Sequence, residues 1–572
     1  MNTQPILETI KNNIIGKDAS IKTPFGERLM TYADYTASGR ALSIVEDYLN
    51  HCMETYGNTH TEDDITGAES TFRLHQAEKI IKNQVNAGSD YVIIETGAGA
   101  TGAIHYLQQL LGIYIPPAGK EMRRTILTDC FGSDWYEEYS ACLMNNRPVV
   151  FVGPYEHHSN EISWRECFAE VVEISLDADG YFDLHDLEEK LSRKEYDGRM
   201  KIGSFSAASN VTGLKSPVYD IAALLHRYDA LAFFDYAAAA PYVDINVNRN
   251  KESFFDGIFF SPHKFLGGPG GSGILIIHKR IYKASLPPTI AGGGTVDYVN
   301  AYVQEYCRDI ETREKAGTPG ILQIYKAALA MDLKGKIGID LIEEREKNLL
   351  RTVLDNLADC PNIQLVAPMD EEHNLPILSF NVRCGSSWIH PRFAVKLLND
   401  LFGIQARAGC SCAGPYGHHL LHIDGDISEH YHDAIRKGNM GLKPGWARVS
   451  FHYLMSENEA VFICKAIRFL GEYAKYFLPL YSFDIHSGAW QHRTYTAPAT
   501  GFGIDEALES AGEAAHEIPE QHRKDIRSLG EEYLEHAERL AKELRETYRH
   551  CTFKTTQADL ISFLYVETYG EQ

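Results

Sequence analysis

The chain has 572 residues, 44% of them hydrophobic, which is enough to fold as more than one domain around large apolar cores. Its 78 Asp and Glu residues outnumber the 55 Lys and Arg residues, and the formal net charge is -23 at pH 7. This charge repels phosphate backbones and anionic membrane surfaces, so nucleic acid and membranes are not expected as partners. The first residues lack the basic and apolar regions of a signal peptide, and no apolar run approaches the ~20 residues of a membrane span. We therefore expect a soluble, cytoplasmic protein.

Short apolar, β-rich runs alternate with helical stretches between about residues 91 and 277. The runs are YVIIET (91–96), RTILTD (124–129), PVVFVG (148–153), KIGSFSAAS (201–209), LAFFDY (231–236), GIFFSP (257–262) and GILIIH (273–278). This alternation predicts an α/β domain with a mostly parallel sheet and helices on both faces. Ligands in such domains bind beyond the carboxyl ends of the strands.

The pattern changes after Thr318 to a long helical segment, a strand-like run and further helices, which indicates a smaller α+β domain completed by N-terminal residues. The last helix of this domain is expected near residues 457–476. The expected organisation is an N-terminal segment joining the small domain (1–30), a large domain (31–315), a small domain (316–478) with an insertion (416–445), and an extension (479–572).

The extension contains a charged stretch, EEYLEHAERLAKELRETYRH (531–550), with Leu and Ala at helical spacing, and then a short β-like end. An amphipathic helix of this kind needs a surface to pack on. We expect a packing or oligomerisation element. The insertion is rich in histidine, and its sequence fits either a substrate-selecting lid or a solvated surface loop.

Three segments carry cofactor chemistry. In FFSPHKFLGGPGGSG (259–273), Lys264 follows a strand beside Ser261 and His263 and precedes a glycine-rich turn, where backbone can approach a ligand closely. The run LAFFDYAAAAP ends an apolar strand on Asp235, whose burial needs a cationic partner such as a protonated pyridine nitrogen. The loop in ETGAGATGAIHYLQQLLG (95–112) joins a strand to a helix and points backbone N–H groups at a phosphate.

Each segment alone has an ordinary structural explanation, and GAGATG is neither the dinucleotide fingerprint nor a nucleoside triphosphate loop. In the order phosphate loop, aspartate, lysine, the three segments together indicate one bound pyridoxal 5'-phosphate (PLP).

These motifs resemble the class V aminotransferase superfamily, and within it the cysteine desulfurase and selenocysteine lyase group, over about residues 30–475. The resemblance implies PLP fold type I, with a mostly parallel seven-stranded sheet in the large domain, and a homodimer. It assigns Lys264 to the Schiff base, Asp235 to the pyridine nitrogen, and the pair Ser261 and His263 to the phosphate.

Further roles follow from the same resemblance. The phosphate-loop threonine falls on Thr101, with Ala100 standing where a second threonine is common. EHHSN assigns ring stacking and proton relay to His157, and ASNVTG places Asn210 near the cofactor oxygen and the substrate carboxylate. AGTPG assigns Thr318 to the phosphate of the neighbouring subunit.

The register of RAGCSCAGP resembles the loop of the nucleophilic cysteine, which falls on Cys412, and WARVSFHY resembles the segment whose arginine binds the substrate carboxylate, here Arg448. A thiolate at Cys412 can take sulfur or selenium from a PLP-bound amino acid, forming a persulfide for an acceptor protein or releasing selenide. The nearby Cys410 can resolve such a persulfide or be inert. A structural role for the two cysteines, a surface ion pair for Arg448, and a metal site with the insertion's histidines remain alternatives, although no metal is expected.

The expected reaction is removal of sulfur from L-cysteine, or of selenium from L-selenocysteine, giving alanine. Ala238 stands where glutamine is common in desulfurases, so the usual hydrogen bond to the cofactor's phenolic oxygen is missing. Alternatives are another class V reaction, such as a C–S lyase acting on a larger thioether or sulfoxide, an aminotransferase or an epimerase. A third alternative is a non-catalytic sulfur-carrier or regulatory protein with the same fold.

Overall fold

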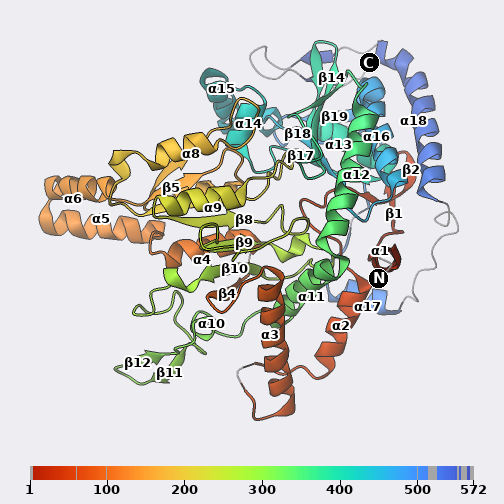
Figure 1. Cartoon of the computed structure of the whole chain (residues 1–572). Helices are drawn as coiled ribbons and strands as arrows, with labels where there is room; N and C mark the ends of the chain where they lie inside the picture. Colours follow the sequence, from red (N-terminus) through yellow and green to blue (C-terminus); the bar gives the residue numbers. More distant parts are fainter. Residues whose placement is uncertain are drawn as a thin grey trace. The chain divides into compact units, whose positions relative to one another are not determined.

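In the computed structural model the chain divides into two compact units (Figure 1). Unit 1 comprises Met1–Ile15 and Thr36–Glu344, and unit 2 comprises Gly16–Tyr35 and Arg345–Gln572. The structure describes residues 4–59, 61–97, 99–498, 500–512, 525–549, 553–555 and 563–566. None of the helices within these ranges is long and apolar enough to cross a bilayer.

The centre of unit 1 is a seven-stranded sheet. Its strands lie in the order β4 (Tyr91–Thr96), β10 (Gly273–His278), β9 (Gly257–Phe260), β8 (Ala230–Asp235), β7 (Lys201–Ser206), β5 (Val149–Val152) and β6 (Glu170–Glu173). Only β10 runs antiparallel to its neighbours. The mostly parallel sheet predicted from the sequence is therefore confirmed. Its strands read as apolar runs because helices cover both faces of such a sheet.

Helices of unit 1 pack around this sheet. The described helices are α1 (Gln4–Asn12), α2 (Ser43–Glu54), α3 (Ile65–Gln84), α4 (Gly99–Leu110), α5 (Pro117–Phe131), α6 (Ser133–Asn145), α7 (Ile162–Arg165), α8 (Leu184–Leu191), α9 (Val218–Arg227), α10 (Ile310–Arg313) and α11 (Ile321–Ile337). Short 3-10 turns are η1 (His158–Asn160), η2 (Lys194–Tyr196), η3 (Pro262–Lys264) and η4 (Lys279–Ile281), and β11 (Val296–Val299) pairs with β12 (Gln304–Tyr306). Unit 1 extends past residue 315 because α11 packs along α3.

The strand expected at RTILTD is wrong, because residues 124–129 lie within α5. Helices α5 and α6 form a hairpin that projects from the sheet (Figure 1), and neither helix has a buried residue. A central strand of a parallel sheet is buried on both faces, which the charged side chains of Arg123, Arg124 and Asp129 do not permit. The edge of the sheet is formed instead by β6, a run that the sequence reasoning did not select.

Unit 2 contains a five-stranded sheet and the C-terminal helices. The described strands of unit 2, in this sheet and outside it, are β1 (Ser20–Thr23), β2 (Gly26–Leu29), β3 (Thr31–Tyr32), β13 (Ile363–Leu365), β14 (Ile377–Cys384), β15 (Ser387–Ile389), β16 (Ile404–Gln405), β17 (Arg407–Gly409), β18 (Trp446–Ser450), β19 (Tyr481–Asp484), β20 (Ala489–His492), β21 (Phe553–Thr555) and β22 (Leu564–Val566). The sheet runs β13-β14-β18-β17, with β15 paired to β14. Its helical elements are α13 (Pro391–Phe402), α14 (Gly414–Leu420), α15 (Gly425–Arg436), η5 (Met440–Leu442), α16 (Glu457–Tyr473), η6 (Ala474–Leu480), α17 (Ile504–Gly512) and α18 (Ile526–Arg549).

The long helical segment predicted after Thr318 is two helices. Gly338 has a φ of 89°, a left-handed conformation that ends α11 before α12 (Ile339–Leu357) begins. The boundary between the two compact units falls within α12, between Glu344 and Arg345.

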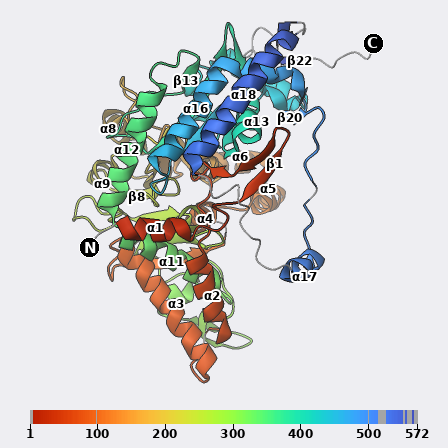
Figure 2. The ribbon, with the colours of Figure 1, turned by 90° about the vertical axis from the view of Figure 1, so that its right-hand side faces the viewer.

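The amphipathic helix of the extension packs on its own unit. Helix α18 lies beside α16 (Figure 2) and buries small residues there, among them Gly530, Ala537 and Ala541. The Arg28 guanidinium also lies 4.6 Å from the centre of the Tyr533 ring, within cation–π range. Helix α18 of the extension is thus part of the core of unit 2.

Enlarging Gly530 should destabilise this packing. A Cβ atom at this position would lie 2.6 Å from Cδ2 of Phe462 on α16. We expect Gly530→Leu to lower the free energy of unfolding by about 1–3 kcal/mol, the usual cost of overpacking. The matched control is Glu535→Leu on the exposed side of α18. Urea unfolding followed by circular dichroism measures both, and equal stabilities of the two variants would contradict the packing described.

Candidate functional site

The predicted pyridine partner, Asp235, ends the central strand β8. Its carboxyl group is buried and accepts a hydrogen bond from the Ala237 backbone N–H at 2.8 Å. Burial raises the pKa of Asp235 to about 6, against the opposing effects of this hydrogen bond and of the positive charge on Lys264. A buried carboxyl group beside an amine is ready to hold a further cation, such as a protonated ring nitrogen.

The lysine segment is a tight turn at the end of the neighbouring strand β9. The Lys264 N–H donates to the Ser261 carbonyl at 3.0 Å, which forms the 3-10 turn η3. Gly268 is required behind this turn, because a Cβ atom there would lie 1.9 Å from the Pro262 carbonyl oxygen. The pKa of His263 is lowered, first by burial and then by the charge of Lys264, so its imidazole is neutral near pH 7.

The predicted phosphate loop packs directly on the lysine segment. Gly99 starts α4 with a φ of 57°, and a Cβ atom there would lie 2.8 Å from Ser261 Oγ. The Ala100 N–H donates to the same oxygen at 2.8 Å, and the Thr101 hydroxyl shares a hydrogen bond with Ser159. The N-terminus of α4 and the Ser261 hydroxyl are therefore brought together, as a phosphate site requires. Ala98 of this loop lies outside the described residues.

The histidine segment is held by a buried acid that sequence reasoning missed. The Glu156 carboxyl group accepts hydrogen bonds from the backbone N–H groups of Gly153 and Ser206, from the Ser206 hydroxyl and from the Asn160 amide. Burial raises its pKa to about 7 despite these donors. The adjacent His157 accepts the Ser159 N–H at Nδ1, 3.1 Å away. The only sequence signal for Glu156 was its position at the start of EHHSN.

Asn210 and Thr318 lie in other loops of unit 1. Asn210 is buried in a turn where the Ser209 hydroxyl oxygen accepts the N–H groups of Val211 and Thr212. The Thr318 hydroxyl accepts a hydrogen bond from the Asn58 side-chain amide at 3.2 Å. Thr318 is exposed in the loop before α11.

The residues of unit 1 fit PLP. Asp235 offers a buried carboxyl group to the ring nitrogen, Lys264 an amine, and Ser261 with the start of α4 donors for a phosphate. Ala238 is small and buried beside this site, and it adds no hydrogen bond of its own.

The cysteine loop in unit 2 has an unusual backbone. Gly409, Ser411 and Cys412 have φ angles of 121°, 53° and 57°, and the turn is closed by the Ala413 N–H donating to the Cys410 carbonyl at 3.0 Å. Left-handed backbone at residues other than glycine stores strain and occurs often at functional sites. Cys412 is exposed, whereas Cys410 is half-buried.

Arg448 lies in β18 of the same unit, fully buried and paired with a carboxylate. Its Nη2 is 3.1 Å from Asp34 Oδ1, while Nε of the exposed Arg407 is 3.0 Å from Asp34 Oδ2. Arg448 and Arg407 lie opposite each other on the paired strands β18 and β17. Burial lowers the pKa of Arg448, and the charge of Asp34 opposes this shift. Sequence reasoning missed Asp34, because it lies more than 400 residues away along the chain.

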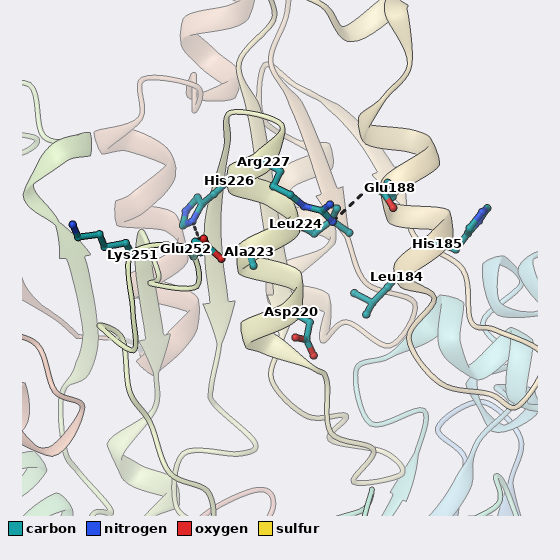
Figure 3. A pocket seen from close by; sticks show the side chains of 10 residues that line it. All are labelled: Leu184, His185, Glu188, Asp220, Ala223, Leu224, His226, Arg227, Lys251 and Glu252. Carbon is teal, nitrogen blue, oxygen red and sulfur yellow. Dashed lines mark hydrogen bonds and ion pairs between the residues drawn. The ribbon is translucent and has the colours of Figure 1, made fainter.

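Two other features of the described residues bear on the site. No group of three or more His, Cys, Asp or Glu side chains among them could hold a metal ion, so the proposed cysteine and histidine metal site lacks support there. An open hollow between α8 and α9 of unit 1 (Figure 3) is lined by residues such as His226 and Glu252, which hydrogen-bond each other. None of the predicted cofactor residues lines this hollow.

Comparison with known proteins agrees with this geometry. Residues 139–461, more than half of the chain, match the family model described as Aminotransferase class-V. A probable cysteine desulfurase of Halalkalibacterium halodurans is 27% identical over 391 residues, which cover 68% of this chain and 84% of that protein. A probable cysteine desulfurase of Pyrococcus abyssi is 29% identical over 294 residues, which cover 51% of this chain and 69% of that protein.

Solved structures share the fold. The apo cysteine desulfurase of Thermococcus onnurineus superimposes with a TM-score of 0.62 at 21% identity, covering 81% of this chain and 98% of that one. The cysteine desulfurase CsdA of Escherichia coli gives a TM-score of 0.59 at 20% identity, with 81% and 97% covered. The predicted PLP fold type I is thereby confirmed.

Asp235 should make the stability of the cofactor-free protein depend on pH. Its pKa of about 6 in the folded chain lies above the ~3.9 of an exposed aspartate. The folded chain holds this proton more tightly, so the stabilisation is fully present below pH ~4 and is lost as pH rises through about 6. We expect the Tm of the wild type, minus that of Asp235→Asn, to fall over this range in thermal scans. A difference that does not change with pH would contradict the burial.

Removing the partner of Arg448 should be costly. We expect Asp34→Asn to lower the free energy of unfolding by about 3–5 kcal/mol, because it removes the carboxylate that neutralises a buried cation. Arg407→Gln removes the exposed partner of the same carboxylate and should lower the free energy of unfolding by less than about 1 kcal/mol. In urea unfolding, the double variant Asp34→Asn with Arg448→Met should lose less free energy of unfolding than the two single variants lose in sum. Additive losses would show that the pair is not coupled.

Proposed function

Because this chain belongs to the class-V aminotransferase family, we propose that it is a PLP enzyme that removes sulfur from L-cysteine, or selenium from L-selenocysteine, and releases alanine. The observation that carries the proposal is the buried Asp235 carboxyl group beside the Lys264 amine, at the ends of adjacent parallel strands. The names of the relatives, probable cysteine desulfurases, support the choice of reaction.

In this proposal unit 1 binds the cofactor. The Lys264 amine would hold it covalently, Asp235 would keep its ring nitrogen protonated, and His157 would lie against its ring. The N-terminus of α4, together with Ala100, Thr101, Ser261 and His263, would hold its phosphate. When bound, PLP supplies an electron sink that allows an amino acid to lose its Cα proton.

The side chains of the chain itself perform the proton and sulfur transfers. Lys264 Nζ would take the proton from the substrate Cα, and His157 Nε2 would serve as a second proton carrier, since its Nδ1 already accepts the Ser159 N–H. The Cys412 thiolate attacks the substrate sulfur, so that an S–S bond forms and the Cβ–S bond breaks. The electron pair of the broken bond stays with the carbon fragment, which takes up protons and leaves as alanine, while the persulfide remains on Cys412.

Arg448 is proposed to bind the substrate carboxylate through its planar guanidinium, with Asn210 as a second contact. Asp34 is a positioning residue in this scheme, because its ion pair with Arg448 Nη2 fixes the plane of the guanidinium. Cys412 is exposed, so a persulfide formed there would be accessible to a sulfur-acceptor protein.

We further propose a homodimer in the cytoplasm. The β11–β12 hairpin of unit 1 leaves Tyr298, Val299, Tyr302 and Val303 exposed shortly before Thr318, which supports a subunit contact near this residue. All ten described cysteines are free, as is usual in a reducing compartment. A monomer in sedimentation at micromolar concentration would contradict the dimer.

The reaction is tested by assaying alanine and sulfide from L-cysteine, with selenide from L-selenocysteine in parallel. The wild type should be yellow and release alanine and sulfide in equal amounts when a reductant is present. Lys264→Ala should lose both the colour and the activity, whereas Lys347→Ala on the surface should keep both. Cys412→Ser should lower sulfide release by about 100-fold or more while keeping the colour, because the sulfur has no nucleophile to accept it.

Cys410→Ser is the matched control for the cysteine loop and should retain most of the activity. A yellow wild-type protein that is inert towards both substrates would remove the desulfurase proposal and leave the cofactor. A colourless protein that does not bind PLP would favour the non-catalytic alternative.

A further inference from the structure

A cavity of about 240 Å³ lies inside unit 2, where the insertion meets the extension. It is lined by Leu420, Leu421 and Leu442 from the insertion, together with Trp388 and Ile389 of β15. Phe563, in the last described segment of the extension, completes the apolar wall and forms a β-bridge with Trp388. The insertion and the extension, which have no role in the proposed reaction, therefore meet at one cavity beside the sheet of unit 2.

Buried contacts fix the walls of this cavity. His390 donates from Nε2 to the Gly441 carbonyl at 3.0 Å and accepts the Arg392 N–H at Nδ1. Its pKa is lowered to about 4, mainly by burial, so the ring stays neutral and keeps both hydrogen bonds at physiological pH. The Phe563 ring stands edge-on to it at 4.5 Å. The insertion is thus tied to the sheet, as a preformed binding site requires.

The polar groups of the lining favour one class of ligand. Gln364 and Asn381 contribute amides, and Lys443 contributes a cation at the exposed side. None of the described residues that line the cavity is an Asp or a Glu. An apolar cavity of about 150 Å³ accommodates benzene, so the larger space here has room for one aromatic ring with a short side chain. We propose that the cavity binds a small aromatic carboxylate, with the ring between the apolar walls and the carboxylate at Lys443.

The cavity also adjoins both ends of the cysteine loop. Helix α14, which carries Leu420, begins two residues after Cys412. Gly445, which also lines the cavity, packs on Gly409 at the start of the loop. A Cβ atom added at Gly445 would lie 2.6 Å from the Gly409 carbonyl carbon. A bound ligand restrains both segments that lead into the strained loop, and it therefore acts as an effector of Cys412 reactivity. This inference does not rest on the proposed desulfurase activity.

Calorimetric titration of the full chain with phenylacetate and with phenylacetamide tests the binding. Phenylacetate should bind, and Leu421→Trp, which fills the cavity, should abolish binding, whereas Leu508→Trp on the surface of unit 2 should not. Lys443→Gln should weaken the binding of phenylacetate by about five-fold and leave the binding of phenylacetamide nearly unchanged. Lys437→Gln is the control for this variant. Absence of phenylacetate binding, or equal binding by Leu421→Trp, would overturn the proposal. If Leu421→Trp does not fold, the Lys443→Gln comparison decides it.

The effector role is tested by alkylation of Cys412 with iodoacetamide, followed by mass spectrometry of the peptide. Saturating phenylacetate should slow this alkylation at least about two-fold in the wild type, because fewer loop conformations remain accessible. It should leave the alkylation rate of exposed Cys142 in unit 1 unchanged. An unchanged rate at Cys412 with phenylacetate bound would refute the effector role.

Discussion

The candidate cofactor site depends on a carboxyl group buried in the middle of a parallel sheet. Asp235 ends β8, the fourth of seven strands, where water is excluded and an unpaired negative charge is expensive. The neighbouring strand β9 ends at the turn that carries Lys264, so the parallel register brings the amine beside the acid. The same turn supplies Ser261, whose hydroxyl holds the start of α4. The parallel register and one side-chain hydrogen bond thereby bring together a buried carboxyl group, an amine and a helix N-terminus.

Sequence reasoning found the parts of this site whose signals are local. The apolar runs that end in Asp235 and Lys264 predicted strands and strand ends correctly, because a buried parallel strand is written in consecutive residues. RTILTD failed because its β-branched residues gave a strand signal that the surrounding charges outweigh in α5. Glu156 and Asp34 were missed because their importance comes from partners far along the chain: a Ser206 hydroxyl for one, and Arg448 for the other.

The insertion and the extension show the same limit. Periodicity predicted that the helix around residues 531–550 needs a partner, but not that the partner is α16 of the same unit. Close approach of the two helices depends on Gly530 facing Phe462, a contact between residues 68 positions apart. Likewise, the cavity wall joins Trp388 to Phe563 through a bridge that no local pattern encodes.

The ion-pair cluster around Arg448 reconciles the burial of this residue with its proposed role in substrate binding. A buried guanidinium without a partner would destabilise unit 2, so a permanent carboxylate is needed when no substrate is present. Asp34 meets that need, yet it is shared with Arg407, which lies opposite on the paired strand. Two guanidinium groups and one carboxylate leave one net positive charge in the cluster. In the proposed reaction, the cluster would therefore be stable by itself and would still attract the carboxylate of an amino acid, whereas a one-to-one pair would be neutral and would attract it far less.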